Sequence, residues 1–163
     1  MTRHRRILTG KRPTKKRLPM RTMRAMRAPA AMRAPLTTEI VPTFLHMLNT
    51  VKLYHWKTTS FATHKATDEL YATLNEKLDD FVEVMLGKRE MGGRAKLLNV
   101  ALIKLGVYSD NDDFTKQIES YKSFLLAMDE SLVVGMKNVD LLAIRDEILA
   151  AFNKFLYLLT LGG

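Results

Sequence analysis

One predicted helix carries two pairs of side chains of the types that commonly bind metal ions. His64 and Asp68 are four residues apart, and Asp79 and Glu83 have the same spacing. A spacing of four places two side chains on adjacent turns of one helix face, where both can reach one ion. Imidazole and carboxylate groups are common ligands of divalent metals. The spacing therefore predicts a metal-binding face on this helix.

The two pairs lie too far apart along the helix to share one ion within a single chain. Asp68 and Asp79 are separated by eleven residues, which is about 16 Å along a helix axis. A second copy of the chain, running antiparallel about a twofold axis, would bring the first pair of one copy beside the second pair of the other. Ala72 lies between the pairs and is small enough to allow this approach. His55, at the end of the preceding helix, is a candidate third ligand of the first group.

Apolar residues at intervals of three and four predict the helix that carries these pairs and another helix before it. The earlier helix is expected to begin with Thr37 or Thr38 as its N-cap and to end within residues 56–60. The next helix is expected to stop at Gly87. Its apolar stripe consists of Leu70, Leu74, Leu78, Phe81 and Met85. The candidate ligands lie about 130° around the helix from this stripe, so they are expected to face away from the chain's own core.

The same spacing predicts two more helices towards the C-terminus. The third is expected to start from a cap at Asn111 or Asp112 and to end near Met136. The fourth is expected to begin at residues 138–140 and to run to about Leu159.

A long connection, residues 88–109, joins the second and third predicted helices and is expected to contain one short helix. Four long helices with one crossover, and no strand signals, predict an all-α, ferritin-like four-helix bundle over residues 37–163. Residues 1–36 are predicted to be a separate, extended arm, because they hold four of the five prolines.

The arm is strongly basic. Of the 26 basic and 17 acidic residues in the chain, 12 basic residues and no acidic residue lie in the arm, which leaves 14 basic and 17 acidic residues for the body. The arm therefore carries a charge of +12 and the body −3. Contacts with phosphates give binding that weakens steeply with salt and depends little on base sequence. The residues expected to bind DNA or another polyanion are Arg3, Arg5, Arg6, Lys11, Arg12, Lys15, Lys16, Arg17, Arg21, Arg24, Arg27 and Arg33.

Two other interpretations of the arm stay open. A mitochondrial transit peptide is also rich in arginine and poor in acids, but it is typically rich in serine, and this arm has none. Alternatively, the arm packs on the surface of a large protein assembly. Repeated Met-Arg-Ala and Met-Arg-Thr units within residues 20–34 pair flexible apolar side chains with charge and favour this second alternative.

Several classes of protein and site are disfavoured by the composition. The chain has no cysteine, which excludes disulfides, thiolate metal sites and a cysteine nucleophile. No apolar run is long enough for a membrane span, and no signal-peptide pattern is present. Phosphate-binding loops, hydrolase serine elbows and zinc-finger spacings are also absent. We therefore expect a soluble intracellular protein, with a nucleoid or a virion as possible locations.

The candidate ligands and their surroundings resemble the ferroxidase signature of the Dps family, the DNA-binding ferritins of starved cells. The resemblance rests on the run Leu53-Tyr54-His55-Trp56, on His64 with Asp68, and on Asp79 with Glu83. The last helix, with Lys154-Phe155-Leu156-Tyr157, is also similar to the fourth helix of that family, and the resemblance covers roughly residues 38–163.

The resemblance implies an activity, a cofactor and partners. The iron ligands would be His55, His64 and Asp68 from one subunit and Asp79 and Glu83 from its twofold mate, with Trp56 beside the site. The protein would be a homo-oligomer, formed through the helix that carries these acids, that oxidises ferrous iron. Its basic arm would bind DNA, as arms do in some members of the family.

A second resemblance points to a ferritin-like family encoded by large DNA viruses of eukaryotes. It rests on Gly87-Lys88-Arg89 and on Ile144-Arg145-Asp146-Glu147-Ile148. It implies the alternative function, a structural protein of a virion or nucleoprotein assembly. In that role the arm would anchor the helical body to capsid or nucleoprotein subunits, without iron chemistry.

Overall fold

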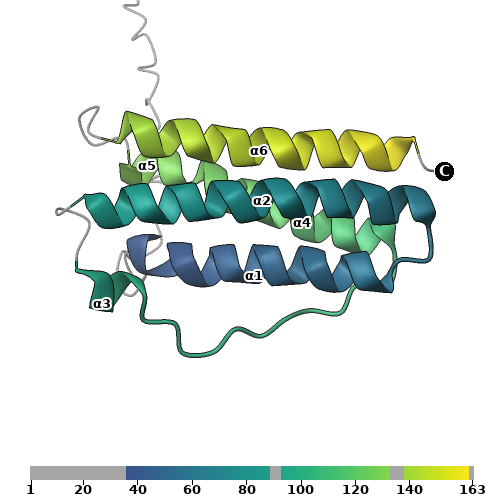
Figure 1. Ribbon diagram of the computed structural model, residues 1–163, viewed down its shortest axis with the longest axis horizontal. Coiled ribbons are helices and arrows are strands. Elements are labelled where there is room, and N and C mark those ends of the chain that lie inside the picture. The colour runs from purple at the N-terminus through teal and green to yellow at the C-terminus, as the bar shows by residue number, and fades with distance from the viewer. Residues whose placement is uncertain (1–35, 89–92, 133–137, 162–163) are drawn as a thin grey trace, which may run out of the picture. The chain divides into compact units, whose positions relative to one another are not determined.

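The computed structural model describes residues 36–88, 93–132 and 138–161, and every regular element in these ranges is an α-helix (Figure 1). The four long helices are α1 (Leu36–Lys57), α2 (Phe61–Gly87), α4 (Asn111–Leu126) and α6 (Val139–Thr160). Two short helices are α3 (Arg94–Leu97) and α5 (Met128–Leu132). The all-helical prediction is therefore confirmed for the described residues. The twelve basic residues predicted to bind a polyanion all lie outside them.

The long helices pack through one apolar core. Helix α2 contacts α6 on one side and α1 on the other, and α4 contacts α6. The predicted stripe on α2 is confirmed, because Leu70, Leu74, Leu78, Phe81 and Met85 are all buried. Aromatic rings link the helices across this core. Phe44 of α1 meets Phe81 edge-on with ring centroids 5.1 Å apart, and Phe114 of α4 stacks on Tyr54 of α1 at 3.8 Å.

Residues 58–60 make the tight turn between α1 and α2. Ser60 is the N-cap of α2, since its side chain accepts a hydrogen bond of 3.3 Å from the backbone N–H of Thr63. At the other end, α1 begins at Leu36, so the prediction that Thr37 or Thr38 caps it is wrong: both residues lie within the helix. The turn places the last residues of α1 directly beside the first residues of α2.

The connection between α2 and α4 contains the short helix that was predicted. This helix is α3, and its last residue, Leu97, is buried in the core. Beyond it the chain has no helix until α4, whose N-cap is Asp110 rather than Asn111 or Asp112. The Asp110 carboxylate accepts a hydrogen bond of 2.9 Å from the backbone N–H of Asp113, which a side chain one residue later would not reach in the same way.

Helix α4 ends earlier than predicted, at Leu126 instead of near Met136, and α5 follows it. Residues 133–137 lie outside the described ranges. The buried guanidinium group of Arg145 accounts for this break. Its Nη1 donates a hydrogen bond of 3.0 Å to the backbone carbonyl of Leu125, and its Nη2 bonds Asp129 of α5 at 2.7 Å. A side chain from α6 thus takes up a carbonyl that a continuous helix would pair with its own backbone.

Arg145 is only 5% exposed. Among the described residues, Arg145 and His55 are the only buried side chains that can carry a charge near neutral pH. Its Nε lies 2.8 Å from Oδ1 of Asp146, but without the alignment of a hydrogen bond. The guanidinium therefore joins α4, α5 and α6 through two hydrogen bonds and one further charge contact. No described helix is long and apolar enough to cross a membrane.

Replacing Arg145 is expected to destabilise the fold. Arg145→Met removes the hydrogen bonds to the Leu125 carbonyl and to Asp129, and it should lower the free energy of unfolding by about 2–3 kcal/mol. Arg145→Lys cannot reach both acceptors, so its free energy of unfolding should lie between those of Arg145→Met and the wild type. Urea unfolding followed by far-UV circular dichroism measures this. Asp146→Asn is the control, because its carboxylate is exposed and should contribute less than about 0.5 kcal/mol. An Arg145→Met protein as stable as the wild type would contradict this role.

Candidate metal centre

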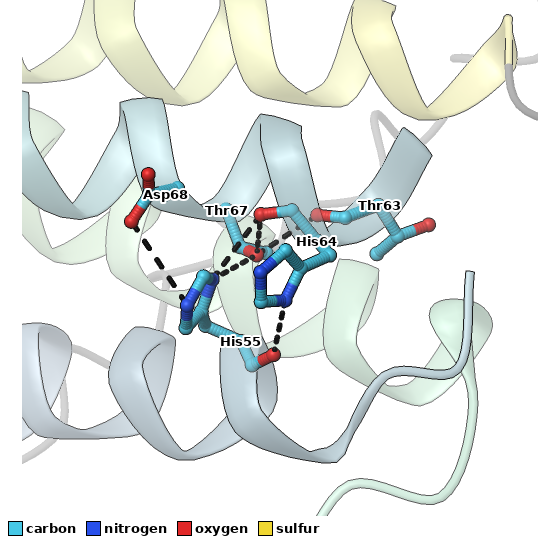
Figure 2. Close-up of polar contacts among 5 residues, drawn as sticks. All are labelled: His55, Thr63, His64, Thr67 and Asp68. Atoms are coloured by element: carbon cyan, nitrogen blue, oxygen red, sulfur yellow. Dashed lines mark hydrogen bonds and ion pairs between the residues drawn. The ribbon is translucent and has the colours of Figure 1, made fainter. Parts of the chain in front are cut away.

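His55 and His64 face each other across the turn between α1 and α2 (Figure 2). His55 lies in the last turn of α1 and is 7% exposed, and His64 lies in the first turn of α2 and is half-buried. Their rings stack with centroids 4.0 Å apart and an angle of 24° between the planes. The predicted approach of His55 to the ligands on the second helix is therefore present in the structure.

Each histidine ring is bonded to the backbone of the other residue. Nδ1 of His64 lies 3.1 Å from the carbonyl oxygen of His55, and Nδ1 of His55 lies 3.2 Å from the carbonyl oxygen of His64. A carbonyl oxygen can only accept, so both Nδ1 atoms must donate their N–H. In the neutral rings, the lone pairs are then on the two Nε2 atoms. A histidine that binds a metal typically donates its other ring N–H in this way.

Thr67 supports His55 from the next turn of α2. It is fully buried, and its hydroxyl donates a hydrogen bond of 2.8 Å to the carbonyl of Thr63. The same oxygen lies 3.2 Å from Nδ1 of His55, so it shares the N–H of that ring with the carbonyl oxygen of His64. Sequence reasoning missed Thr67. The signal was a small polar residue at a core position, three residues after His64.

Asp68 lies on the open side of the histidine pair. Its Oδ1 is 3.9 Å from Nε2 of His55, and its side chain is more than half exposed (Figure 2). This distance is too long for a hydrogen bond. Within one chain, the His55 ring thus lies beside both the His64 ring and the Asp68 carboxylate.

Asp79 and Glu83 are not brought to this group within one chain. Helix α2 is continuous from Phe61 to Gly87, which keeps Asp79 about 16 Å along the axis from Asp68. Both acids are exposed, and neither makes an ion pair with another described residue. No group of three or more described histidine or acidic side chains is close enough to hold a metal ion. Within a single chain, the two pairs therefore stay apart.

Tyr54 fixes the end of α1 that carries His55. Its hydroxyl donates a hydrogen bond of 2.7 Å to Oδ1 of Asn111, at the start of α4. Burial raises the pKa of the Tyr54 phenol, and the negative charge of Asp110 raises it further. The phenol therefore stays protonated as a donor. Because its ring also stacks on Phe114, the residue before His55 has little freedom to move.

Trp56, next to His55, points outward rather than into the core, with 68% of its surface exposed. Lys52 links it to Tyr71 of α2, since its Nζ lies 4.4 Å from the centroid of the Tyr71 ring and 5.7 Å from that of Trp56. Such cation–π contacts hold a lysine over aromatic faces. The outer surface beside the histidine pair is therefore formed by an aromatic and basic cluster, consisting of Lys52, Trp56 and Tyr71.

Comparison with known proteins assigns a family but no activity. No curated protein matches the chain, and no solved structure does. Residues 55–159 match the model of a family described as a family of unknown function, DUF5856. The match starts at His55, includes all five candidate ligands and leaves out the basic arm. Because it extends over more than half of the chain, this protein belongs to the DUF5856 family.

Proposed function

We propose that this protein is a Dps-like iron-binding protein with ferroxidase activity, and that its basic arm binds DNA or another polyanion. The observation that carries the proposal is the reciprocal bonding of His55 and His64. Each ring donates its Nδ1 proton to the other residue's backbone, so that both Nε2 lone pairs remain free, and Nε2 of His55 lies 3.9 Å from Asp68.

Ferrous iron is the substrate of the proposed reaction. His55, His64 and Asp68 of one chain would bind it together with Asp79 and Glu83 of a second copy. Two ferrous ions would each give one electron to peroxide, which would take up two protons and leave as two water molecules; oxygen is the alternative oxidant. The carboxylate oxygens, as hard ligands, would stabilise the ferric product. The buried Thr67 and the stacked rings would keep the histidines in the tautomer that binds the ion.

The arrangement of the helices supports a ferritin-like four-helix bundle as the scaffold. In this scheme α1, α2, α4 and α6 are the four helices, and the segment that contains α3 is the crossover between the second and third. Subunits paired through α2 would assemble further into a closed shell that stores the oxide. The basic arms would project from that shell to bind phosphates.

Removing the two acids from the second half of α2 is expected to abolish the oxidation. Asp79→Ala/Glu83→Ala should lower the initial rate of iron oxidation by at least about tenfold, since each site would lose two of its ligands. The rate is followed optically after ferrous iron and peroxide are added to the full-length protein. Glu76→Ala/Asp80→Ala is a matched control, with the same spacing on the same helix, and should keep the wild-type rate. Equal rates in all three proteins would refute the ferroxidase proposal.

The arm is expected to bind DNA through phosphates alone. Log affinity should fall linearly with log salt, and replacing Arg12, Lys15, Lys16 and Arg17 by Ala should reduce this slope by about 3–4 units. Fluorescence anisotropy with two unrelated DNA duplexes of equal length measures both the slope and the sequence preference. Asp79→Ala/Glu83→Ala should leave the binding unchanged. A slope that is the same with and without the four bases would exclude the arm as the DNA-binding segment.

A second candidate function is the structural protein of a virion or nucleoprotein assembly. The observation that favours it is the row of exposed apolar side chains on the connection before α4. Leu102 and Val107 are 77% and 82% exposed, and Leu98 and Leu105 are also exposed. Four exposed apolar side chains on one connection form surface that a partner protein would cover. In this role the protein would show no iron oxidation above the level of the Asp79→Ala/Glu83→Ala variant.

A further inference from the structure

The outward face of α2 has exposed side chains at both of its ends. Phe61, at its first position, is 76% exposed. Lys65 and Glu83 are exposed, and neither makes an ion pair with another described residue. An exposed phenylalanine and unpaired charges along one helix face are features that a second protein surface would cover.

The residues on this face are spaced symmetrically about one point. Lys65 and Glu83 are 18 residues apart, which is about five full turns, so they lie on one line along the helix. Phe61 and Leu86 are 25 residues apart, which is nearly seven turns. Leu86 is half-buried, and its side chain also packs against the chain's own core. The midpoints of both pairs fall at residues 73–74, close to Ala72. A twofold axis at this point would place each member of a pair opposite the other member in a second copy.

The two halves of the face carry opposite charges at one pair of positions. The N-terminal half presents His64, Lys65 and Asp68, and the C-terminal half presents the carboxylates of Asp79 and Glu83. Next to the C-terminal half, an apolar groove of about 350 Å³ lies between α1 and α2. Its walls include Leu45, Leu48, Leu78 and Val82. An antiparallel second copy would set Lys65 against Glu83 and would cover apolar surface at the same time. Asp68 would face Asp79, so the attraction between charges in this contact comes from the Lys65–Glu83 pairs.

We propose that Phe61 and Lys65 determine the register of a contact between two copies of this chain through α2. Phe61 packs against Leu86 of the second copy, and Lys65 pairs with Glu83 of the second copy. The inference rests on the proposed function, because the same register sets Asp79 of the second copy beside Asp68. Lys65 is thereby a positioning residue. It holds one oxygen of the Glu83 carboxylate and leaves the other directed at the space beside His64.

Reversing either charge is expected to break the contact, and reversing both is expected to restore it. Lys65→Glu and Glu83→Lys should each raise the dissociation constant of the dimer by at least about tenfold, because each creates two like-charge contacts per dimer. The double variant, Lys65→Glu/Glu83→Lys, should return it to within about threefold of the wild type. Sedimentation equilibrium of the full-length protein in the presence of a chelator measures these constants.

The control is Lys96→Glu, an exposed charge reversal on α3 that should not change the dissociation constant. Far-UV circular dichroism checks that every variant is folded. A monomeric wild type, or a double variant no better associated than the single ones, would overturn the proposed register. Because the chelator keeps iron out, this outcome is independent of the oxidation assay. A protein that pairs in this register but oxidises no iron contradicts only the ferroxidase proposal.

A cross-linking experiment tests the register in an assembly of any size. The chain contains no cysteine, so Phe61→Cys and Leu86→Cys each introduce a single thiol. A short bismaleimide should link the two variants when they are mixed and allowed to exchange subunits. Either variant alone should stay unlinked, because equivalent residues of the two copies would lie about 37 Å apart. Equal linking within each variant alone, or none in the mixture, would overturn the proposal.

Discussion

The short turn between α1 and α2 is the constraint on which the candidate site depends. Residues 58–60 reverse the chain, and the Ser60 cap starts α2 at once. His55 and His64 are therefore held opposite each other, close enough for each ring to bond the other's backbone. A longer turn would let the two helices separate, and the rings would lose both the stacking and the hydrogen bonds that select their tautomer. Thr67 and Tyr54 support the same geometry from the two sides, one through the His55 ring and the other through the backbone before it.

The length and continuity of α2 keep Asp79 and Glu83 away from the histidine pair and Asp68. An unbroken helix is a stiff spacer, and Asp79 and Glu83 stay on the far half of α2 whatever their side chains do. The buried apolar stripe of α2 packs against α1 and α6. The other face of α2, which carries the candidate ligands, is therefore directed outward. The two pairs of candidate ligands therefore remain on separate halves of α2 within one chain.

Polar groups in the core shape the C-terminal part of the fold. The guanidinium of Arg145 takes the Leu125 carbonyl and binds Asp129, so α4 stops and α5 begins where an uninterrupted helix was expected. Burying a guanidinium is costly unless its donors are bonded, and its Nε lacks a well-aligned acceptor among the described residues. The arrangement therefore holds three helices at one point through a single side chain.

The sequence by itself determined the helical class, the stripe on α2 and the face on which the candidate ligands lie, because these follow from a period of 3.6 residues along one chain. It also placed the end of α2 at Gly87 and the start of α6 at residues 138–140 correctly, since the residue types that mark helix ends are local signals. Tertiary structure decided what depends on contacts between distant segments. It decided the tautomers of His55 and His64, the support by Thr67 and the outward position of Trp56. It also decided the end of α4, because the group that stops this helix belongs to α6, twenty residues further along the chain.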